Sequence, residues 1–228
     1  MNLYVDPIST TSRAVLALCR HESIEISVNV ISLMKGEHHQ PPFAGLNPNR
    51  LVPVLVDGDF VLTESSAILR YLARTQGSSL YPAEPRRAAR VDELMAWFES
   101  NFYKDFGYQY VYPQLLQEHK RPGSANDATV EWGRTQSRRW LEVLDTHLLR
   151  ECDPFLLGSN LSIADFHGAA ILSLGELVGC TFQHYPNVRK WYLAVTKLES
   201  WQAVNTEFSG FARSLEGQAF ITLEAAHA

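Results

Sequence analysis

The sequence predicts an α/β domain with the element order β-α-β-loop-β-β-α, followed by a domain built only of helices. Residues 24–30 alternate between apolar and polar side chains, which is the period of a strand with one buried face. Residues 51–56 and 60–62 are short apolar runs on either side of an Asp-Gly-Asp turn, a pattern typical of a β-hairpin. Beyond Pro85, apolar residues recur at helical spacing, so the second domain is predicted to be helical.

Composition and charge favour a globular protein without a nucleic-acid or membrane partner. The 228 residues are 46% hydrophobic, which is enough for a core, and the net charge of −5 is spread without long runs. No apolar segment reaches the ~20 residues of a membrane span, and the N-terminus lacks a signal pattern, so we expect a cytoplasmic protein. Cys19, Cys152 and Cys180 are widely spaced without a CxxC pair, which argues against a disulfide framework or a metal site.

The first domain is predicted to span residues 1–76. A strand at residues 3–5, a turn, a helix over 12–20 and the alternating strand form a β-α-β unit. Residues 35–50 are polar and rich in proline and histidine, so we expect an irregular loop there. After the hairpin, a helix over residues 67–74 closes the domain.

A linker over residues 77–85 leads into the all-helical domain, which is predicted to span residues 86–228. Ser162 and Asp165 have the spacing of a capping box, which predicts a helix start. Pro113 is predicted to kink or end the first long helix. The other helical patterns cover residues 86–112, 129–149, 187–197 and 201–215.

The stretch Thr63-Glu64-Ser65-Ser66 places one acid and three hydroxyls where a strand becomes a helix. The first amides of a helix lack intrahelical partners and carry positive partial charge, so a carboxylate or phosphate is attracted there. The same residues would also form an ordinary N-cap, with Thr63 or Ser65 accepting from those amides. Other features of the sequence are therefore needed to distinguish an anion-binding site from a simple helix cap.

The predicted element order is the thioredoxin-like arrangement, in which a dithiol opens the first helix. Here the four residues at that position all carry hydroxyls: Ser9, Thr10, Thr11 and Ser12. Hydroxyls cannot exchange disulfides, so thioredoxin chemistry is unavailable to this chain.

With these residues in place, the chain resembles the glutathione S-transferases over nearly its whole length, and most of all the theta-type enzymes that use serine. The resemblance implies glutathione as co-substrate, no metal, and a two-fold homodimer. The motifs that carry it are Leu3-Tyr4-Val5-Asp6-Pro7-Ile8-Ser9, Ser12-Arg13-Ala14-Val15, Lys35-Gly36-Glu37-His38, Asn47-Pro48, Val52-Pro53, Asp57-Gly58-Asp59-Phe60, Leu62-Thr63-Glu64-Ser65, Ala89-Arg90-Val91-Asp92-Glu93 and the capping box.

The resemblance implies that Ser9 is the catalytic residue. A thiol with a pKa near ~8.5 is mostly protonated at pH 7, whereas only the thiolate is a good nucleophile. A hydroxyl that donates a hydrogen bond to sulfur stabilises the anion, and the helix N-terminus behind it adds favourable partial charge. Thr10 and Ser12 are neighbouring hydroxyls that could take over this role or assist in binding, and a simple turn or cap serine is the alternative interpretation of Ser9.

The resemblance also assigns partners to the rest of glutathione. Val52, before a Pro53 that the family holds in cis, would pair its backbone with the cysteinyl unit like an added strand. Glu64 would take the γ-glutamyl ammonium, while Ser65 and the helix amides take the carboxylate. His38 would approach the glycyl carboxylate, although a histidine in a polar loop is as often exposed to solvent.

Leu51 departs from the family pattern, because serine-type relatives usually place a basic or amide side chain just before the Val-Pro pair. The glycyl carboxylate thereby loses an expected partner. Arg50 is the alternative partner one position earlier, but adjacent residues of a strand point to opposite faces. Weaker glutathione binding, or another carboxylate partner, follows from this departure.

The second substrate is expected to be a small apolar electrophile, because the helical domain carries an aromatic cluster. Aromatic residues at helical spacing are more often core than pocket, so only part of this set is expected to face the sulfur. Tyr103 falls where some theta-type enzymes carry an arginine, which argues against a sulfate or other strong anion as leaving group. The candidates for the pocket wall are Trp97, Tyr103, Phe106 and Tyr110.

Three functions stay open on the sequence. The first is conjugation of glutathione to an electrophile, including dehalogenation by displacement of halide. The second is a related reaction of the same thiolate, such as peroxide reduction or isomerisation, which no sequence feature separates from the first. The third is a non-catalytic binding protein of the same fold, which the departure at Leu51 keeps open.

Overall fold

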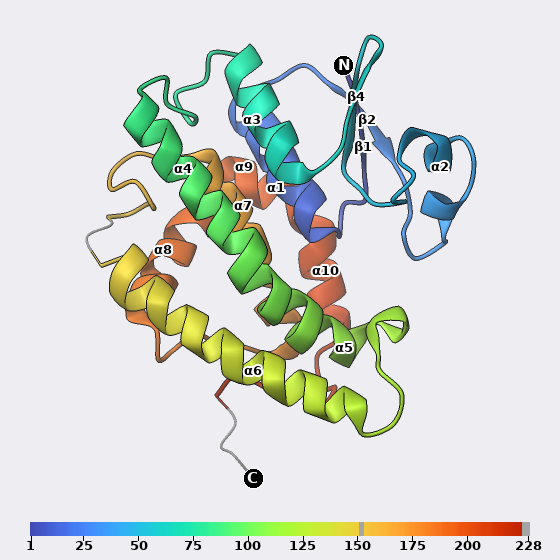
Figure 1. Ribbon diagram of the computed structural model, residues 1–228, viewed down its shortest axis with the longest axis vertical. Helices are drawn as coiled ribbons and strands as arrows, with labels where there is room; N and C mark the ends of the chain where they lie inside the picture. Colours follow the sequence, from blue (N-terminus) through green and yellow to red (C-terminus); the bar gives the residue numbers. More distant parts are fainter. Residues whose placement is uncertain (151–152, 225–228) are drawn as a thin grey trace.

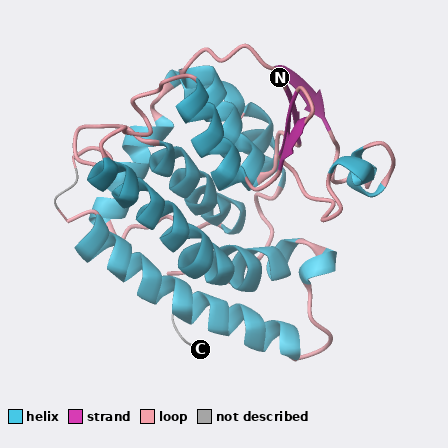
Figure 2. Cartoon of the chain, turned by 45° about the horizontal axis from the view of Figure 1, so that its top comes forward, coloured by secondary structure: helices cyan, strands magenta, loops and turns pink. Residues whose placement is uncertain are grey.

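Strands and helices occupy separate parts of the molecule, which is a computed structural model describing residues 1–150 and 153–224 (Figure 1). Figure 2 shows the strands gathered at one end and helices forming the rest. The N-terminal domain is thioredoxin-like, as the sequence predicts, and an all-helical domain follows. The elements of the first domain are β1 (Asn2–Val5), α1 (Thr10–His21), β2 (Ser27–Val30), η1 (Glu37–His39), α2 (Phe43–Leu46), β3 (Val54–Asp57), β4 (Phe60–Leu62) and α3 (Ser65–Thr75).

The sheet is mixed and has the strand order β2-β1-β3-β4. Strands β1 and β2 are parallel, whereas β3 runs antiparallel to both β1 and β4. Leu3 and Leu55 are paired across β1 and β3 and are fully buried in the main core, which α1 and α3 also line. The other face is covered by the segment around α2, where Phe43 packs with Val54.

Strand β2 is shorter than predicted and keeps its valines exposed. It begins at Ser27, and Val28 and Val30 are 49% and 58% exposed. Because β2 is the edge strand of the sheet, no further strand covers it. The alternating pattern thus identified the strand, but it did not predict that the valine side chains would be exposed.

The helical domain follows the predicted order, with additional breaks. The prediction that Ser162 and Asp165 form a capping box is confirmed at the start of α7. Pro113 lies in the first turn of α5, where a missing N–H is tolerated, so the chain stays helical through it. The elements are α4 (Pro85–Trp97), η2 (Phe98–Tyr103), η3 (Phe106–Val111), α5 (Tyr112–Leu115), η4 (Gln117–His119), α6 (Ala125–Val143), η5 (Leu144–Leu148), α7 (Ile163–Leu172), η6 (Ser173–Val178), α8 (Pro186–Thr196), α9 (Glu199–Val204) and α10 (Thr206–Ser214).

Helix α7 is the centre of the helical domain, and all its residues are buried. Its N-terminus is held by Asp165, whose Oδ2 accepts hydrogen bonds from the Ser162 N–H and hydroxyl, both at 2.8 Å. The Asp165 Oδ1 accepts from the Leu156 N–H at 2.8 Å and the Trp191 indole at 2.9 Å. One buried carboxylate therefore joins the start of α7 to the preceding loop and to α8.

Helix α1 joins the two domains. It packs against α3 in its own domain and against α7 and α9 of the helical domain. Its two flanks are therefore both covered, and even Ser12 and Arg13 are fully buried. The free thiols Cys19 and Cys180 are buried, and Cys152 lies outside the described residues. None of the described helices has the length and apolar character needed to cross a membrane.

We predict that Asp165→Ala lowers the free energy of unfolding by about 3 kcal/mol or more. Four donors lose their acceptor, and each buried donor left without one costs about 1–3 kcal/mol. Asp127→Ala is the matched control, because Asp127 is an exposed acid in the first turn of α6, and we expect a change within about 0.5 kcal/mol there. Urea unfolding followed by circular dichroism measures both values, and a loss below about 1 kcal/mol at Asp165 contradicts its central role.

Candidate functional site

The turn between β1 and α1 is fixed by a buried carboxylate. Asp6 accepts hydrogen bonds from the Ile8 N–H at 2.8 Å and the Leu33 N–H at 2.9 Å. Ser9 follows as the N-cap of α1, and its Oγ accepts from the Ser12 N–H at 3.5 Å. A cap that accepts through its oxygen keeps its hydroxyl hydrogen for another acceptor. Thr11 gives its own hydrogen to the Val52 carbonyl, so the half-buried Ser9 hydroxyl donates to Thr11 Oγ1 at 3.3 Å. A ligand acceptor at the start of α1 can replace Thr11 in this long hydrogen bond.

The other three hydroxyls of this segment have protein partners. Thr10 Oγ1 lies 3.2 Å from the Tyr112 hydroxyl, and Thr11 Oγ1 donates to the Val52 carbonyl at 3.0 Å. Ser12 is fully buried, and its Oγ accepts from the Asp6 N–H at 3.4 Å. Thr11 Oγ1 is also 3.3 Å from the Ser9 Oγ, so Thr11 links Ser9 to the chain at Val52.

The chain at Val52 presents an open backbone edge. The Val52–Pro53 peptide bond is cis, which confirms the expectation. The Leu51 carbonyl is occupied by the Asn47 side chain at 2.8 Å, whereas no described residue accepts a hydrogen bond from the Val52 N–H. Val52 and Ser65 each lie three residues beyond the last pair of the β3–β4 ladder, Leu55 and Leu62, at the open end of the hairpin. An extended ligand strand could thus pair here, between the starts of α1 and α3.

The start of α3 has an unusual backbone. Its N-cap residue Glu64 has φ 66° and ψ 116°, and no side chain caps the first amides. Positive φ is strained for a residue with a Cβ, and such strain often marks a functional site. Ser65 and Ser66 are buried beside these amides. The helix start therefore offers uncapped N–H groups to an anion, with the exposed Glu64 carboxylate next to them.

Basic groups gather near the other end of this edge. Burial and the neighbouring His39 lower the pKa of His38, so its imidazole is neutral at pH 7, and its buried Nδ1 has no described partner. The charges of Glu118 and Asp6 act on the His38 pKa in the opposite sense, and Arg50 adds a smaller lowering. Arg50 lies in a tight turn at φ 56° rather than in a strand, so the strand-based objection to this side chain does not apply. Leu51 is 56% exposed.

Tyrosines of the helical domain lie across from the start of α1. The Tyr112 hydroxyl, already in contact with Thr10, is 2.7 Å from the Tyr103 hydroxyl. Burial raises the pKa of Tyr112 to about 12, so this hydroxyl stays protonated at neutral pH. The rings of Tyr108 and His119 both pack on Tyr112. Tyr103 is a predicted pocket residue, whereas Tyr112 is not among those predicted from the sequence.

The remaining aromatic candidates lie in the core of the helical domain. Phe106 is fully buried and stacks on Phe102 with a centroid distance of 4.7 Å. Tyr110 is fully buried, and its hydroxyl donates to the Ile221 carbonyl at 2.7 Å. Trp97 packs on the Phe102 ring. Only Tyr103 of the four candidates is joined by hydrogen bonds to the residues at the start of α1.

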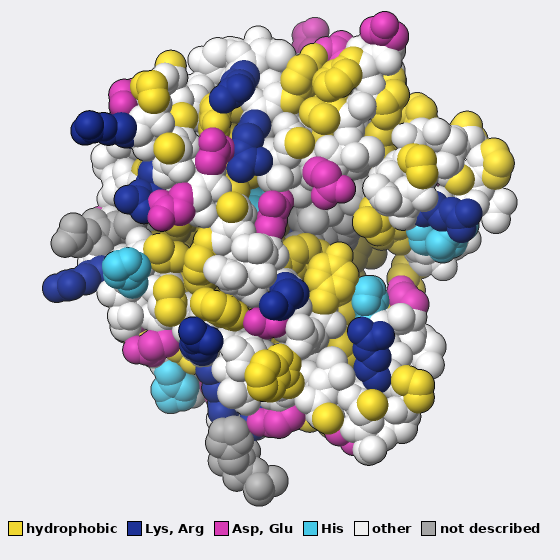
Figure 3. All heavy atoms as spheres, in the orientation of Figure 1, with side chains coloured by type: hydrophobic (Ala, Val, Ile, Leu, Met, Phe, Trp, Pro, Cys, Tyr) yellow, Lys and Arg dark blue, Asp and Glu magenta, His cyan; other side chains and the backbone are white. Residues whose placement is uncertain are grey.

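The site as a whole is a cleft between the two domains. Figure 3 shows a recess on this face, between the lobe that contains α2 and the helical domain below it. In Figure 1, α1 and α3 both begin on the side of their domain that faces the helical domain. Within the part of the chain that the structure describes, no group of three or more His, Cys, Asp or Glu could hold a metal ion. The arrangement offers hydroxyl donors, an open strand edge and an anion-binding helix start.

Comparison with protein families places both domains. Residues 8–75 match the family described as the glutathione S-transferase N-terminal domain, and residues 106–199 match the glutathione S-transferase C-terminal domain. Bovine glutathione S-transferase theta-1 is 33% identical over 198 residues, which cover 84% of this chain and 80% of the bovine protein. Mouse glutathione S-transferase theta-1 is 32% identical over 204 residues, which cover 86% of this chain and 82% of the mouse protein.

Solved structures give the same result. Human glutathione transferase theta-2, in complex with glutathione and an unknown ligand, superposes with a TM-score of 0.84 at 28% identity, covering 97% of this chain and 92% of the human chain. The apo form of human glutathione S-transferase T1-1 superposes with a TM-score of 0.80 at 28% identity, covering 96% and 91%. The similarity therefore includes both domains.

We predict that Glu64→Gly is more stable than Glu64→Ala by about 1 kcal/mol, because glycine adopts positive φ without a Cβ penalty. At Glu93, an exposed position of α4, we expect the reverse order, with alanine more stable by about 1 kcal/mol. Urea unfolding of the four variants measures both differences. If alanine is the more stable residue at both positions, Glu64 stores no backbone strain.

Proposed function

Because this chain belongs to the glutathione S-transferase family, we propose that it uses the Ser9 hydroxyl to activate the thiol of glutathione for attack on a small apolar electrophile. The chain is a glutathione transferase, and the proposal concerns how it performs this activity. The observation that supports it most is the position of Ser9, which caps the buried helix α1 beside the open edge at Val52. The proposed co-substrate is glutathione, with no metal.

Ser9 would act by stabilising charge on sulfur. Its hydroxyl donates a hydrogen bond to the thiolate, and the start of α1 adds positive partial charge, so the thiol loses its proton to solvent at a lower pH. The thiolate sulfur then forms a bond to carbon of the electrophile, and the electron pair of the broken bond leaves on a halide or an oxygen. Thr10 and Ser12 support this geometry through Tyr112 and Asp6 rather than by contacting the sulfur.

The two ends of glutathione find complementary groups. The γ-glutamyl carboxylate would accept from the Ser65 hydroxyl and the uncapped amides of α3, and the Glu64 carboxylate would hold the ammonium group. The Val52 N–H and carbonyl would pair with the cysteinyl unit, next to the cis Pro53. The Val52 N–H is unpaired among the described residues, and the carbonyl has a second lone pair beside the one that accepts from Thr11.

The glycyl carboxylate would lie near His38 and Arg50, which replace the polar partner missing at Leu51. The buried Nδ1 of the neutral His38 can donate a hydrogen bond, and Arg50 supplies charge from its turn. With His38 and Arg50 as carboxylate partners, we favour a chain that binds glutathione over a family member that has lost glutathione binding. The departure at Leu51 then changes the carboxylate partner without removing it.

The electrophile would lie against Tyr103, Tyr108 and Tyr112. Because the Tyr112 hydroxyl stays protonated at neutral pH, it can donate to an oxygen that gains charge as its bond to carbon breaks. We also infer a cytoplasmic protein with a role in detoxification, which assembles as a homodimer. The exposed Phe60 and Val61 of the edge strand β4 support the homodimer, because exposed apolar groups at a sheet edge favour association.

We predict that Ser9→Ala lowers kcat for conjugation about 100-fold, because removal of one donor to a reacting anion costs that order of magnitude. The Ser9→Ala variant should still be retained on immobilised glutathione, since binding uses the backbone edge at Val52 and the start of α3. The thiol pKa of bound glutathione rises without its donor, so part of the lost rate returns at high pH. The measurement is the pH dependence of kcat.

Ser124→Ala is the matched control for this test, because Ser124 is an exposed serine at the N-cap of another helix, α6. We expect its kcat to equal that of the parent chain. Conjugation by Ser9→Ala at the parental rate contradicts the role of the hydroxyl. A parent chain that neither binds glutathione nor conjugates it contradicts the proposed function as a whole.

We predict that Tyr112→Phe separates two classes of electrophile. Opening of an epoxide, whose oxygen needs a donor, should slow by about tenfold or more, whereas displacement of halide should change by less than about threefold. Tyr185→Phe, at the start of α8, is the control for loss of a tyrosine hydroxyl, with both rates unchanged. Steady-state kinetics with a matched epoxide and alkyl halide give the ratio, and equal effects on both contradict this role of Tyr112.

A further inference from the structure

Helix α1 carries a buried cation one turn after Ser9. The Arg13 guanidinium is fully buried, and its Nη1 donates to Asn205 while its Nη2 donates to the Ser173 hydroxyl at 2.9 Å. It also lies over the Phe208 ring, 3.6 Å from the centroid. Arg13 thus contacts η6, α10 and the residue between α9 and α10. All of these contacts are to uncharged groups.

No carboxylate among residues 1–150 and 153–224 lies within ion-pair distance of Arg13, and its Nε has no hydrogen-bond partner there. The titratable groups that act on it are Tyr192 of α8, Glu176 of η6, Tyr112 of α5 and Tyr103 of η2. Glu176 is the acid in this set, but it is exposed and bonded to the Tyr192 hydroxyl, so solvent screens its charge.

The charge of Arg13 persists at neutral pH despite burial. Burial lowers the pKa of Arg13 to about 10, which is still well above pH 7. A buried charge without a counter-ion is costly, so its retention beside a reactive centre suggests a use. In a poorly solvated interior, the field of such a charge extends further than it does at the surface.

The Arg13 charge lies close to the start of α1. Ser9 and Arg13 are four residues apart, about 6 Å along the helix axis, and helical side chains lean toward the N-terminal end of their helix. Burial raises the pKa of Tyr112, and the Arg13 charge is among the influences that oppose this rise. The Tyr112 hydroxyl contacts Thr10, the neighbour of Ser9. The cation therefore acts on Tyr112, which joins the start of α1 through Thr10, next to the position proposed for the sulfur.

We propose that Arg13 is a positioning residue whose buried positive charge favours the thiolate form of glutathione bound at Ser9. The inference rests on the proposed function and adds a second source of positive potential to the amides of α1. Arg13 does not touch the substrate, and acts through its fixed place between α1 and α10.

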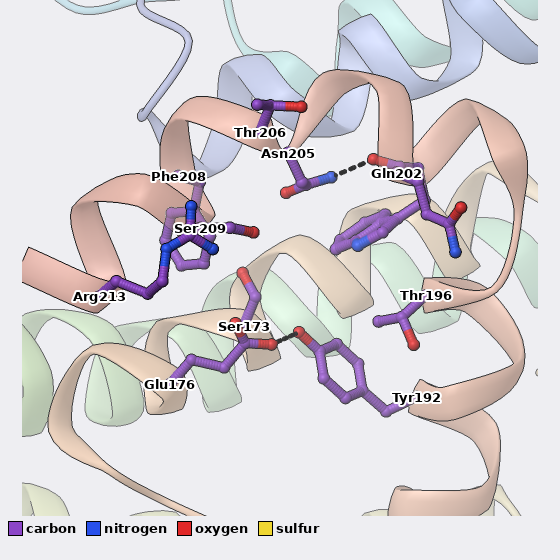
Figure 4. Close-up of a pocket in the computed structure, with 11 residues that line it drawn as sticks. Ser173, Glu176, Tyr192, Thr196, Gln202, Asn205, Thr206, Phe208, Ser209 and Arg213 are labelled. Carbon is purple, nitrogen blue, oxygen red and sulfur yellow. Dashed lines mark hydrogen bonds between the residues drawn. The ribbon is translucent and has the colours of Figure 1, made fainter. Parts of the chain in front are cut away.

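The surroundings of Arg13 hold it in that place. Ser173, Asn205 and Phe208 line a pocket of about 350 Å³, which Arg13 itself does not line. Figure 4 shows these three residues and Arg213 of α10 around that pocket, with Asn205 also donating to the Trp201 carbonyl at 2.7 Å. Two hydrogen bonds and a ring thus fix the guanidinium without neutralising it.

Two variants test the charge in different ways. Arg13→Gln removes it, whereas Asn205→Asp keeps Arg13 and places a carboxylate where its amide oxygen accepts from Nη1. In both variants the thiol pKa of bound glutathione, measured from the ultraviolet absorbance of the thiolate as pH is raised, should increase by about one unit. At neutral pH kcat should fall about tenfold and recover above the new pKa, while KM for glutathione stays within about threefold.

The controls separate charge from packing. Arg213→Gln removes an exposed, screened cation from α10 and should leave the thiol pKa unchanged, whereas Arg13→Lys should restore a pKa close to the parental one. If Arg13→Gln does not fold, Asn205→Asp carries the test, because it keeps the buried side chain. Parental thiol pKa values in the folded variants overturn the role of Arg13 alone. A parent chain without a thiolate band overturns the proposed function and this inference together.

Discussion

The structure depends on the packing of α1 between the two domains. Because α3 and the sheet cover one flank and α7 and α9 cover the other, the helix cannot shift without disturbing both cores. Its first turn is therefore fixed, and with it the position of Ser9. The same burial explains why three polar residues in the first half of α1 have defined partners: Thr11 with Val52, Ser12 with Asp6 and Arg13 with Asn205.

The starts of α1 and α3 differ in how their first backbone amides are capped. The amides at the starts of α1 and α3 need acceptors, and in one case a serine supplies it while in the other no side chain does. In the proposed complex, the γ-glutamyl carboxylate of glutathione would take the open amides of α3, and its sulfur would lie at the start of α1. The strained backbone at Glu64 keeps the second helix start open, and the Val52 edge spans the distance between them.

The sequence was sufficient for the element order because each pattern is local. The alternation that marks β2, the turn of the hairpin and the capping box at Ser162 depend on neighbours within a few residues. The exposure of Val28 and Val30 was not predictable, because edge position is a property of the whole sheet. The cis bond before Pro53 came from family resemblance, since no local pattern specifies it.

The aromatic wall was harder to predict for a geometric reason. Tyr103 and Tyr112 are nine residues apart, which is two and a half turns of an α-helix and puts side chains on opposite faces. The intervening chain is π-helical in η2 and η3, so it winds more slowly and brings both hydroxyls together. The most direct test of the whole account is a crystal structure of the chain with bound glutathione. We expect the sulfur within hydrogen-bond distance of Ser9 Oγ and the γ-glutamyl carboxylate on the first amides of α3; a sulfur bound to Thr10 or Tyr112 instead would contradict the account.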